Sequence, residues 1–92
     1  MFDFLKRTKE IFVVIEFRND DTFSLSAHKS FSDAKVCMAA KAILAQDEKQ
    51  SLGFNDSHIK SFTDEHALVE WDGGSQCYTY QLVKAPFYRY RI

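Results

Sequence analysis

The sequence predicts an α+β fold in which one helix packs on a face of an antiparallel sheet of about five strands, in the order β-β-α-β-β-β. Three observations lead to this prediction. One stretch, residues 30–50, has the composition and capping of a helix, whereas the other apolar stretches have the length and alternation of strands. Turn-forming residues separate those strands. Ninety-two residues without a linker or repeat make a single domain over 1–92.

The predicted helix begins at an S-x-x-D capping box, Ser30-Phe31-Ser32-Asp33. The Ser30 side chain can accept a hydrogen bond from a backbone amide of the first turn, and Asp33 favours the positive end of the helix. Residues 34–45 contain strong helix formers and neither Gly nor Pro. The charged positions are scattered around the helix, so its apolar surface is wide, and its alanines allow close packing on a sheet.

Residues 10–18 give the clearest strand. The odd positions from Ile11 to Phe17 face one way, and Phe12 and Val14 face the other. Because both faces are apolar at its start, we expect a central strand that is covered on both sides. Residues 22–27 follow a turn as a second strand, with its apolar side chains inward: Phe23, Leu25 and Ala27.

Three further strands are expected after the helix, at 57–63, at 67–71 and from 76 to Pro86, where the proline ends the strand. Residues 72–75, Asp-Gly-Gly-Ser, predict the tightest hairpin, because such turns need residues that tolerate positive φ. This register aligns the 67–71 face with the face of the last strand that carries Tyr78 and Tyr80. Residues 1–9 are expected to form an N-terminal arm, and residues 86–92 an aromatic and basic tail.

One helix covers one face of a sheet, so the apolar second face needs another cover. The candidates are the N-terminal arm, the aromatic tail, a second copy of the chain, or a different protein. Self-covering and homodimerisation both remain open at this point.

Composition excludes several classes of protein. The net charge of −1 indicates neither a generally basic nor a generally acidic partner. Two cysteines without C-x-x-C spacing favour reduced thiols, and therefore a cytoplasmic location. The longest apolar run, Ile11 to Ile15, has five residues, so no membrane partner is expected.

Nothing in the sequence has the spacing of a catalytic or metal motif. His58 and His66, with Asp56 and Asp64, could form a His and carboxylate metal site, but their spacing matches no zinc motif, and surface positions at strand ends are the favoured interpretation. Glu16 and the other strand carboxylates, Glu70 and Asp72, are expected to be solvated, and Cys37 is expected in the core. No phosphate loop or nucleophile elbow is present. We therefore predict a protein without enzymatic activity, metal or cofactor.

Two binding surfaces are possible. In the C-terminal segment, basic and aromatic residues alternate as they do where a protein grips phosphates and stacks on bases: Lys84, Tyr88, Arg89, Tyr90 and Arg91. The plainer interpretation of that segment is an edge strand. The second surface combines acidic turns with strand aromatics that would anchor a partner protein: Asp20, Asp21, Asp64, Glu65, Trp71, Tyr78 and Tyr80.

By elimination, the sequence predicts a small, cytoplasmic protein–protein interaction module, an inhibitor or adaptor that occludes a site on a larger partner. Phage inhibitors of host defence, such as anti-CRISPR proteins, are one class of compact chains built this way, an analogy of size and architecture alone. The alternative is a nucleic-acid-binding module that uses the C-terminal segment.

Overall fold

The computed structural model describes residues 9–19 and 21–87. In chain order these residues form β1 (Lys9–Arg18), β2 (Asp21–His28), α2 (Phe31–Ser51), β3 (His58–Phe62), β4 (His66–Trp71) and β5 (Gln76–Phe87). All paired strands are antiparallel, and α2 packs on one face of the sheet. The predicted α+β class and element order are confirmed.

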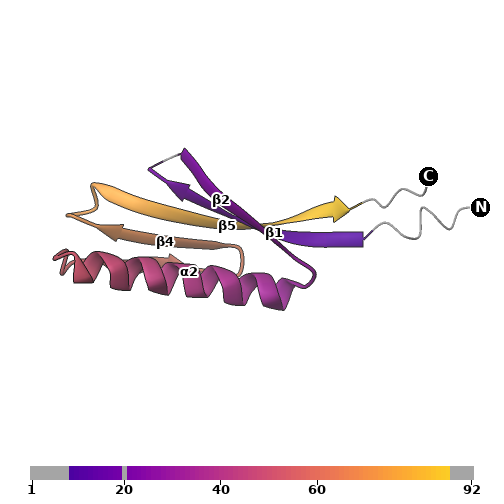
Figure 1. The fold of residues 1–92 in the computed structure, drawn as a ribbon, viewed down its shortest axis with the longest axis horizontal. Coiled ribbons are helices and arrows are strands. Elements are labelled where there is room, and N and C mark those ends of the chain that lie inside the picture. The colour runs from indigo at the N-terminus through magenta and orange to yellow at the C-terminus, as the bar shows by residue number, and fades with distance from the viewer. Residues whose placement is uncertain (1–8, 20, 88–92) are drawn as a thin grey trace, which may run out of the picture.

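The sheet has five strands in the order β2-β1-β5-β4-β3. The first and last strands, β1 and β5, therefore lie side by side at its centre, and they pair from Lys9↔Phe87 to Arg18↔Tyr78. Figure 1 shows α2 running along one side of this sheet. The helix contacts β4 most and β1 and β5 next, and it contacts β2 little. Strand β2 is also an outer strand, which borders only β1.

Helix α2 begins as its capping box predicts. Ser30 is extended, with φ −130°, and its side chain accepts a hydrogen bond from the Asp33 amide at 3.1 Å. The sheet-facing side is made of small residues and one methionine, all buried: Ala34, Met38, Ala42 and Ala45. Away from the sheet the helix exposes Val36 and Ile43, and on the flank that borders the β1–β2 hairpin it exposes Leu44. Because the helix is apolar on more than one side and only one side reaches the sheet, part of its apolar surface stays exposed.

The core lies between α2 and the facing side chains of β1, β4 and β5. It contains Val14, Ala67, Val69, Trp71, Tyr78, Tyr80 and Leu82. The β4–β5 register, with Val69 opposite Tyr78 and Trp71 opposite Gln76, is the register that the 72–75 hairpin predicts. Asp72 and both glycines of that loop have positive φ. Their tolerance of this conformation explains why the turn could be recognised in the sequence.

The predicted interior face of β2 is wrong. Leu25 lies opposite Ile15 on the sheet face away from α2, and 65% of its surface is exposed. A bulge in the β1–β2 pairing, between Glu16 and Phe17, places one extra residue in β2. Because side chains alternate between faces, this extra residue brings Phe23 to the helix side and leaves Leu25 and Ala27 on the other.

The sequence predicts that Pro86 ends the last strand. This prediction is wrong, since β5 continues to Phe87. The Leu82 amide donates to Glu65 O at 2.9 Å, so even-numbered residues of β5 direct their backbone groups toward β4. Residue 86 has the same direction but lies past the last β4 pairing, which is His66 with Gln81. The missing N–H of proline therefore costs no ladder hydrogen bond there.

The second sheet face remains uncovered by the described residues. Its β1 side chains, Ile11, Val13, Ile15 and Phe17, are half-buried, and β5 adds the exposed Val83. The expected cover on both sides of β1 is therefore found on one side only within residues 9–19 and 21–87. Most of the predicted arm (1–8) and tail (88–92) lies outside the described residues.

Candidate functional site

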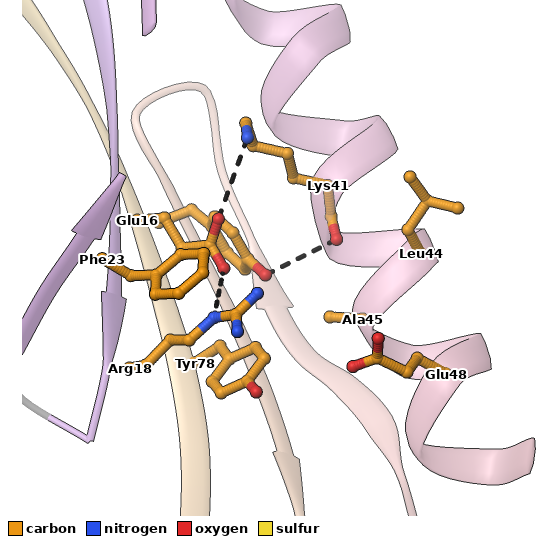
Figure 2. A pocket seen from close by; sticks show the side chains of 9 residues that line it. Glu16, Arg18, Phe23, Lys41, Leu44, Ala45, Glu48 and Tyr78 are labelled. Carbon is orange, nitrogen blue, oxygen red and sulfur yellow. Dashed lines mark hydrogen bonds and ion pairs between the residues drawn. The ribbon is translucent and has the colours of Figure 1, made fainter. Parts of the chain in front are cut away.

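A groove of about 240 Å³ lies between the β1–β2 hairpin and the C-terminal half of α2. Figure 2 shows the side chains that line it: Glu16, Arg18, Phe23, Lys41, Leu44, Ala45, Glu48, Tyr78 and Tyr80. Two exposed apolar side chains are among the lining residues, Phe23 from β2 and Leu44 from α2. Their exposed fractions are 57% and 68%, so both side chains are open to a partner.

Glu16 forms the floor of this groove. Strand alternation places it on the helix side with Phe12 and Val14, and it is only 5% exposed. Arg18 Nε donates to Oε2 at 2.8 Å, and Ser24 Oγ donates to Oε1 at 3.0 Å. Lys41 Nζ approaches Oε1 at 3.8 Å. The expectation of a solvated carboxylate is therefore wrong for Glu16, which is buried and fully partnered.

The Arg18 guanidinium is held between two rings. Its Cζ lies 3.4 Å from the centroid of Phe23 and 4.4 Å from that of Tyr78. Burial opposes the charge of Arg18, but the hydrogen bond and charge of Glu16 outweigh burial, so the pKa of Arg18 is raised. Among the described residues no acceptor contacts its terminal Nη atoms. These atoms remain available to an anionic group in the groove.

The stacking continues beyond Arg18. Lys49 Nζ lies 4.9 Å from the Trp71 ring and 5.1 Å from the Tyr78 ring, and the two rings meet edge to face at 4.8 Å. Aromatic rings and cations thus alternate in a cation–aromatic ladder, in the order Phe23, Arg18, Tyr78, Lys49 and Trp71. It connects β2, β1, β5, the end of α2 and β4, and so fixes the position of Arg18.

Tyr80 closes the groove from below. The ring is 1% exposed, and its hydroxyl donates to Lys41 O at 3.5 Å. Burial raises the pKa of Tyr80 well above its ordinary value, and the negative charge of Glu16 adds to this. The hydroxyl therefore stays protonated and acts as a structural donor.

The groove can recognise a carboxylate that is carried beside an apolar group. Arg18 and Lys41 are cationic, and Glu16 between them is already partnered by both. An arriving carboxylate would find the Nη atoms of Arg18, while Phe23 and Leu44 offer apolar contact. Glu48 lines the same groove and would favour a nearby cation on the partner.

The aromatic anchors expected from the sequence lie in the core. Trp71, Tyr78 and Tyr80 are 4%, 7% and 1% exposed, beneath α2. Only the parts of Tyr78 and Tyr80 that line the groove border open space. These three rings are therefore largely inaccessible from outside, whereas Phe23 and Leu44 are exposed.

The acidic residues do not gather at one place. Asp21 begins β2, next to Arg18, which pairs with Tyr78 near the 72–75 loop. Asp64 and Glu65 lie in the turn at the opposite end of β4, where Asp64 pairs with Lys35 of α2. Asp20 lies outside the described residues. The predicted acidic surface is thus divided between two ends of the sheet.

Asp56 has a structural role in the 72–75 loop. Its carboxylate accepts from the Gly73 amide at 2.7 Å and the Asp72 amide at 3.1 Å. These backbone donors lower the pKa of Asp56. The carboxylate therefore holds the hairpin loop against the segment that leads into β3.

The histidines that suggested a metal site are separated. His58 begins β3, and its Nε2 lies 3.5 Å from Glu70 Oε1. His66 begins β4, at the other end of the β3–β4 hairpin. Within residues 9–19 and 21–87, no three His, Cys, Asp or Glu side chains come together as a metal site would require. Cys37 is half-buried, with its sulfur 3.6 Å from Ser26 Oγ.

The nucleic-acid prediction rests mostly on undescribed residues. Lys84 of β5 pairs with Glu10 at 3.3 Å and is exposed. Tyr88, Arg89, Tyr90 and Arg91 lie outside the described part of the chain.

Comparison of the chain with protein-family models, curated proteins and solved structures finds no match. Within the described residues, no helix has both the length and the apolar character needed to cross a bilayer.

Sequence reasoning missed the groove residues Arg18, Phe23, Lys41 and Leu44. A signal was present, since Glu16 and Arg18 follow Phe12 and Val14 on the same face of the strand, and Glu16 there is buried. A buried acid needs partners, and basic residues on neighbouring elements were the ones to seek. The bulge that brings Phe23 to this side has no local sequence signature.

Proposed function

We propose that this protein is a non-enzymatic protein–protein interaction module, an inhibitor or adaptor, that binds its partner at the groove between β2 and α2. The observation that supports this proposal is the pair of exposed apolar side chains, Phe23 and Leu44, that line the groove together with a fixed guanidinium. Arginine and aromatic side chains are typical of the residues that dominate binding energy in protein interfaces.

The partner we expect presents an acidic side chain next to apolar ones. Arg18 is held by Glu16 and two rings before any partner arrives, so little side-chain freedom is lost when its Nη atoms meet a carboxylate. Binding would also bury the apolar side chains of Phe23 and Leu44, which are mostly exposed in the free chain, and this burial would add to the affinity. A segment of the partner bound in this groove would be covered by the chain. If that segment belongs to a functional site of the partner, binding would block the site.

The test is capture of a partner from lysate of the native host, in parallel with and without nuclease. The baits are the wild type, Phe23→Ala, Leu44→Ala and Val36→Ala. Val36 and Leu44 lie on the same helix and are both 68% exposed, so Val36→Ala is a matched control away from the groove. We expect one larger protein at a fixed ratio with the wild type and Val36→Ala, and its loss with Phe23→Ala and Leu44→Ala.

Capture that is equal for all four baits would refute the groove as the binding site. Loss of the captured material on nuclease treatment would instead favour nucleic-acid binding by the C-terminal segment that contains Lys84. Circular dichroism of each variant shows whether it is folded.

A further inference from the structure

Helix α2 carries a row of exposed side chains on the side that faces away from the sheet (Figure 1). The row contains Asp33, Val36, Ala40, Ile43 and Asp47, and we call it the outer seam. Its members recur at alternating intervals of three and four residues, so they share one side of the helix. The elements that α2 contacts among the described residues are all strands of the sheet, so none of them covers the outer seam.

The spacing of the outer seam favours a helix as its partner. Alternating intervals of three and four residues are those of the a and d positions of a coiled coil, where the side chains of one helix fit between those of another. Val36 and Ile43 are 68% and 49% exposed, so a helix lying along the seam would bury both. Ala40 between them is small and leaves room for a larger side chain of the partner.

The charges on the outer seam are both negative, because the lysines of α2 are engaged elsewhere. Lys35 pairs with a carboxylate in the turn between β3 and β4, Lys41 approaches the buried carboxylate of β1, and Lys49 lies against two core rings. Within residues 9–19 and 21–87, no cation lies at ion-pair distance from Asp33 or Asp47. Electrostatic complementarity therefore requires a partner with a cation at each end of the contact.

The same charges argue against a second copy of the chain as the occupant. Asp33 and Asp47 lie seven residues before and seven residues after Ala40. Antiparallel pairing of two copies about Ala40 would set Asp33 of each copy opposite Asp47 of the other. Parallel pairing in register would set each aspartate opposite itself. Both arrangements bring like charges together, which is unfavourable, so the occupant is a helix of different sequence.

We infer that the outer seam binds a helix of another protein whose own apolar row has a lysine or arginine at each end, spaced as Asp33 and Asp47 are. Its apolar side chains bury Val36 and Ile43, and its cations meet the two aspartates. The inference goes beyond the proposed function and does not depend on it, because the groove offers the cation Arg18 to an anionic group. A chain that uses both surfaces would join two partners of opposite charge preference, as an adaptor does.

The test is the binding of two synthetic helical peptides to the whole chain, measured by fluorescence anisotropy at low salt. Both peptides carry a row of leucines along one side. In one peptide a lysine stands at each end of this row, and in the other a glutamate. We expect the lysine peptide to bind about tenfold more tightly, since the glutamate peptide replaces two exposed ion pairs by two repulsions. The difference should shrink at high salt, which screens exposed charges.

Charge-reversed variants locate the site. In Asp33→Lys with Asp47→Lys, we expect the glutamate peptide to bind more tightly than the lysine peptide. The matched control is Asp21→Lys with Glu65→Lys, which changes the net charge equally at two exposed acids outside α2, and there the lysine peptide should remain preferred. Asp47→Lys alone should reduce the preference for the lysine peptide. It adds a cation near the C-terminal end of α2, which the helix dipole tolerates. Circular dichroism shows whether each variant is folded.

The apolar part of the seam is tested separately. Ile43→Gln should weaken the binding of both peptides, whereas Leu25→Gln, at an exposed leucine of β2, should not. Equal binding of the two peptides to the wild type, or binding of neither, would overturn the inference. So would tighter binding of the glutamate peptide, which would indicate Arg18 as its site. A wild-type dimer, seen by light scattering, that Ile43→Gln dissociates would also overturn it, because a second copy would then occupy the outer seam.

Discussion

Replacing Glu16 by Gln tests whether the buried carboxylate holds the groove together. The change keeps the shape of the side chain but removes the charge that Arg18, Ser24 and Lys41 contact at 2.8, 3.0 and 3.8 Å. A hydrogen bond between charged groups stabilises by about 1.5–3 kcal/mol, and a neutral one by about 1 kcal/mol. The Arg18 side chain is 36% exposed, so screening by water reduces the first of these. The Lys41 contact is long and contributes little. We therefore expect Glu16→Gln to lower the free energy of unfolding by about 2 kcal/mol.

The assay is urea unfolding followed by the fluorescence of Trp71, the single tryptophan, which is 4% exposed and therefore reports on the core. The expected loss corresponds to a melting temperature about 10 °C lower for a chain of this size. Glu10→Gln is the matched control, because Glu10 also lies on β1 and pairs with a lysine, Lys84, but is 59% exposed. Its loss should be about 0.5 kcal/mol or less. Equal losses in the two variants would refute the idea that Glu16 organises the groove.

Three more predictions follow from burial and hydrogen bonding. Met38→Ala, at 0% exposure, should cost about 3 kcal/mol in urea unfolding through the cavity that it leaves, and a cost as small as that of Val36→Ala would contradict this. Asp56→Asn should be less stable than the wild type at neutral pH, and the difference should vanish as the pH falls through the lowered pKa of the folded carboxyl; a urea midpoint gap independent of acid pH would disagree. Tyr80 ionises first in the unfolded chain, so above the ordinary phenol pKa of about 10 the wild type should lose stability with rising pH, and Tyr80→Phe should lose less between about pH 9 and pH 11. Parallel urea midpoints for both proteins across that range measure this difference.

The features that the sequence predicted correctly are those determined by neighbouring residues. The Ser30 cap and the run of helix formers place α2, and the 72–75 loop sets the register that brings Val69 opposite Tyr78. Both depend on local chemistry, a side-chain acceptor in one case and positive φ in the other. The strand ends were also close to those observed.

The features that it missed depend on residues far apart in the chain. A bulge adds one residue to β2 and moves Phe23 to the helix side, although the local alternation of β2 looks regular. Glu16 is buried because Arg18 and Lys41 surround it, and Lys41 arrives from another element. Pro86 is tolerated because β4 has already ended beside it. Each of these outcomes depends on a neighbouring element that the local sequence pattern does not display.

The same strand order has a consequence for how the chain folds as it is synthesised. The hairpins β1–β2 and β4–β5 join strands close in sequence, but the central pair joins β1 to β5, and Lys9 meets Phe87. The ribosome must therefore release β5 before the two halves of the sheet can meet. Until then β1 has one open edge and its apolar residues lack their partners, a state in which chains aggregate. Slow translation of any segment between β1 and the end of β5 would prolong this exposure.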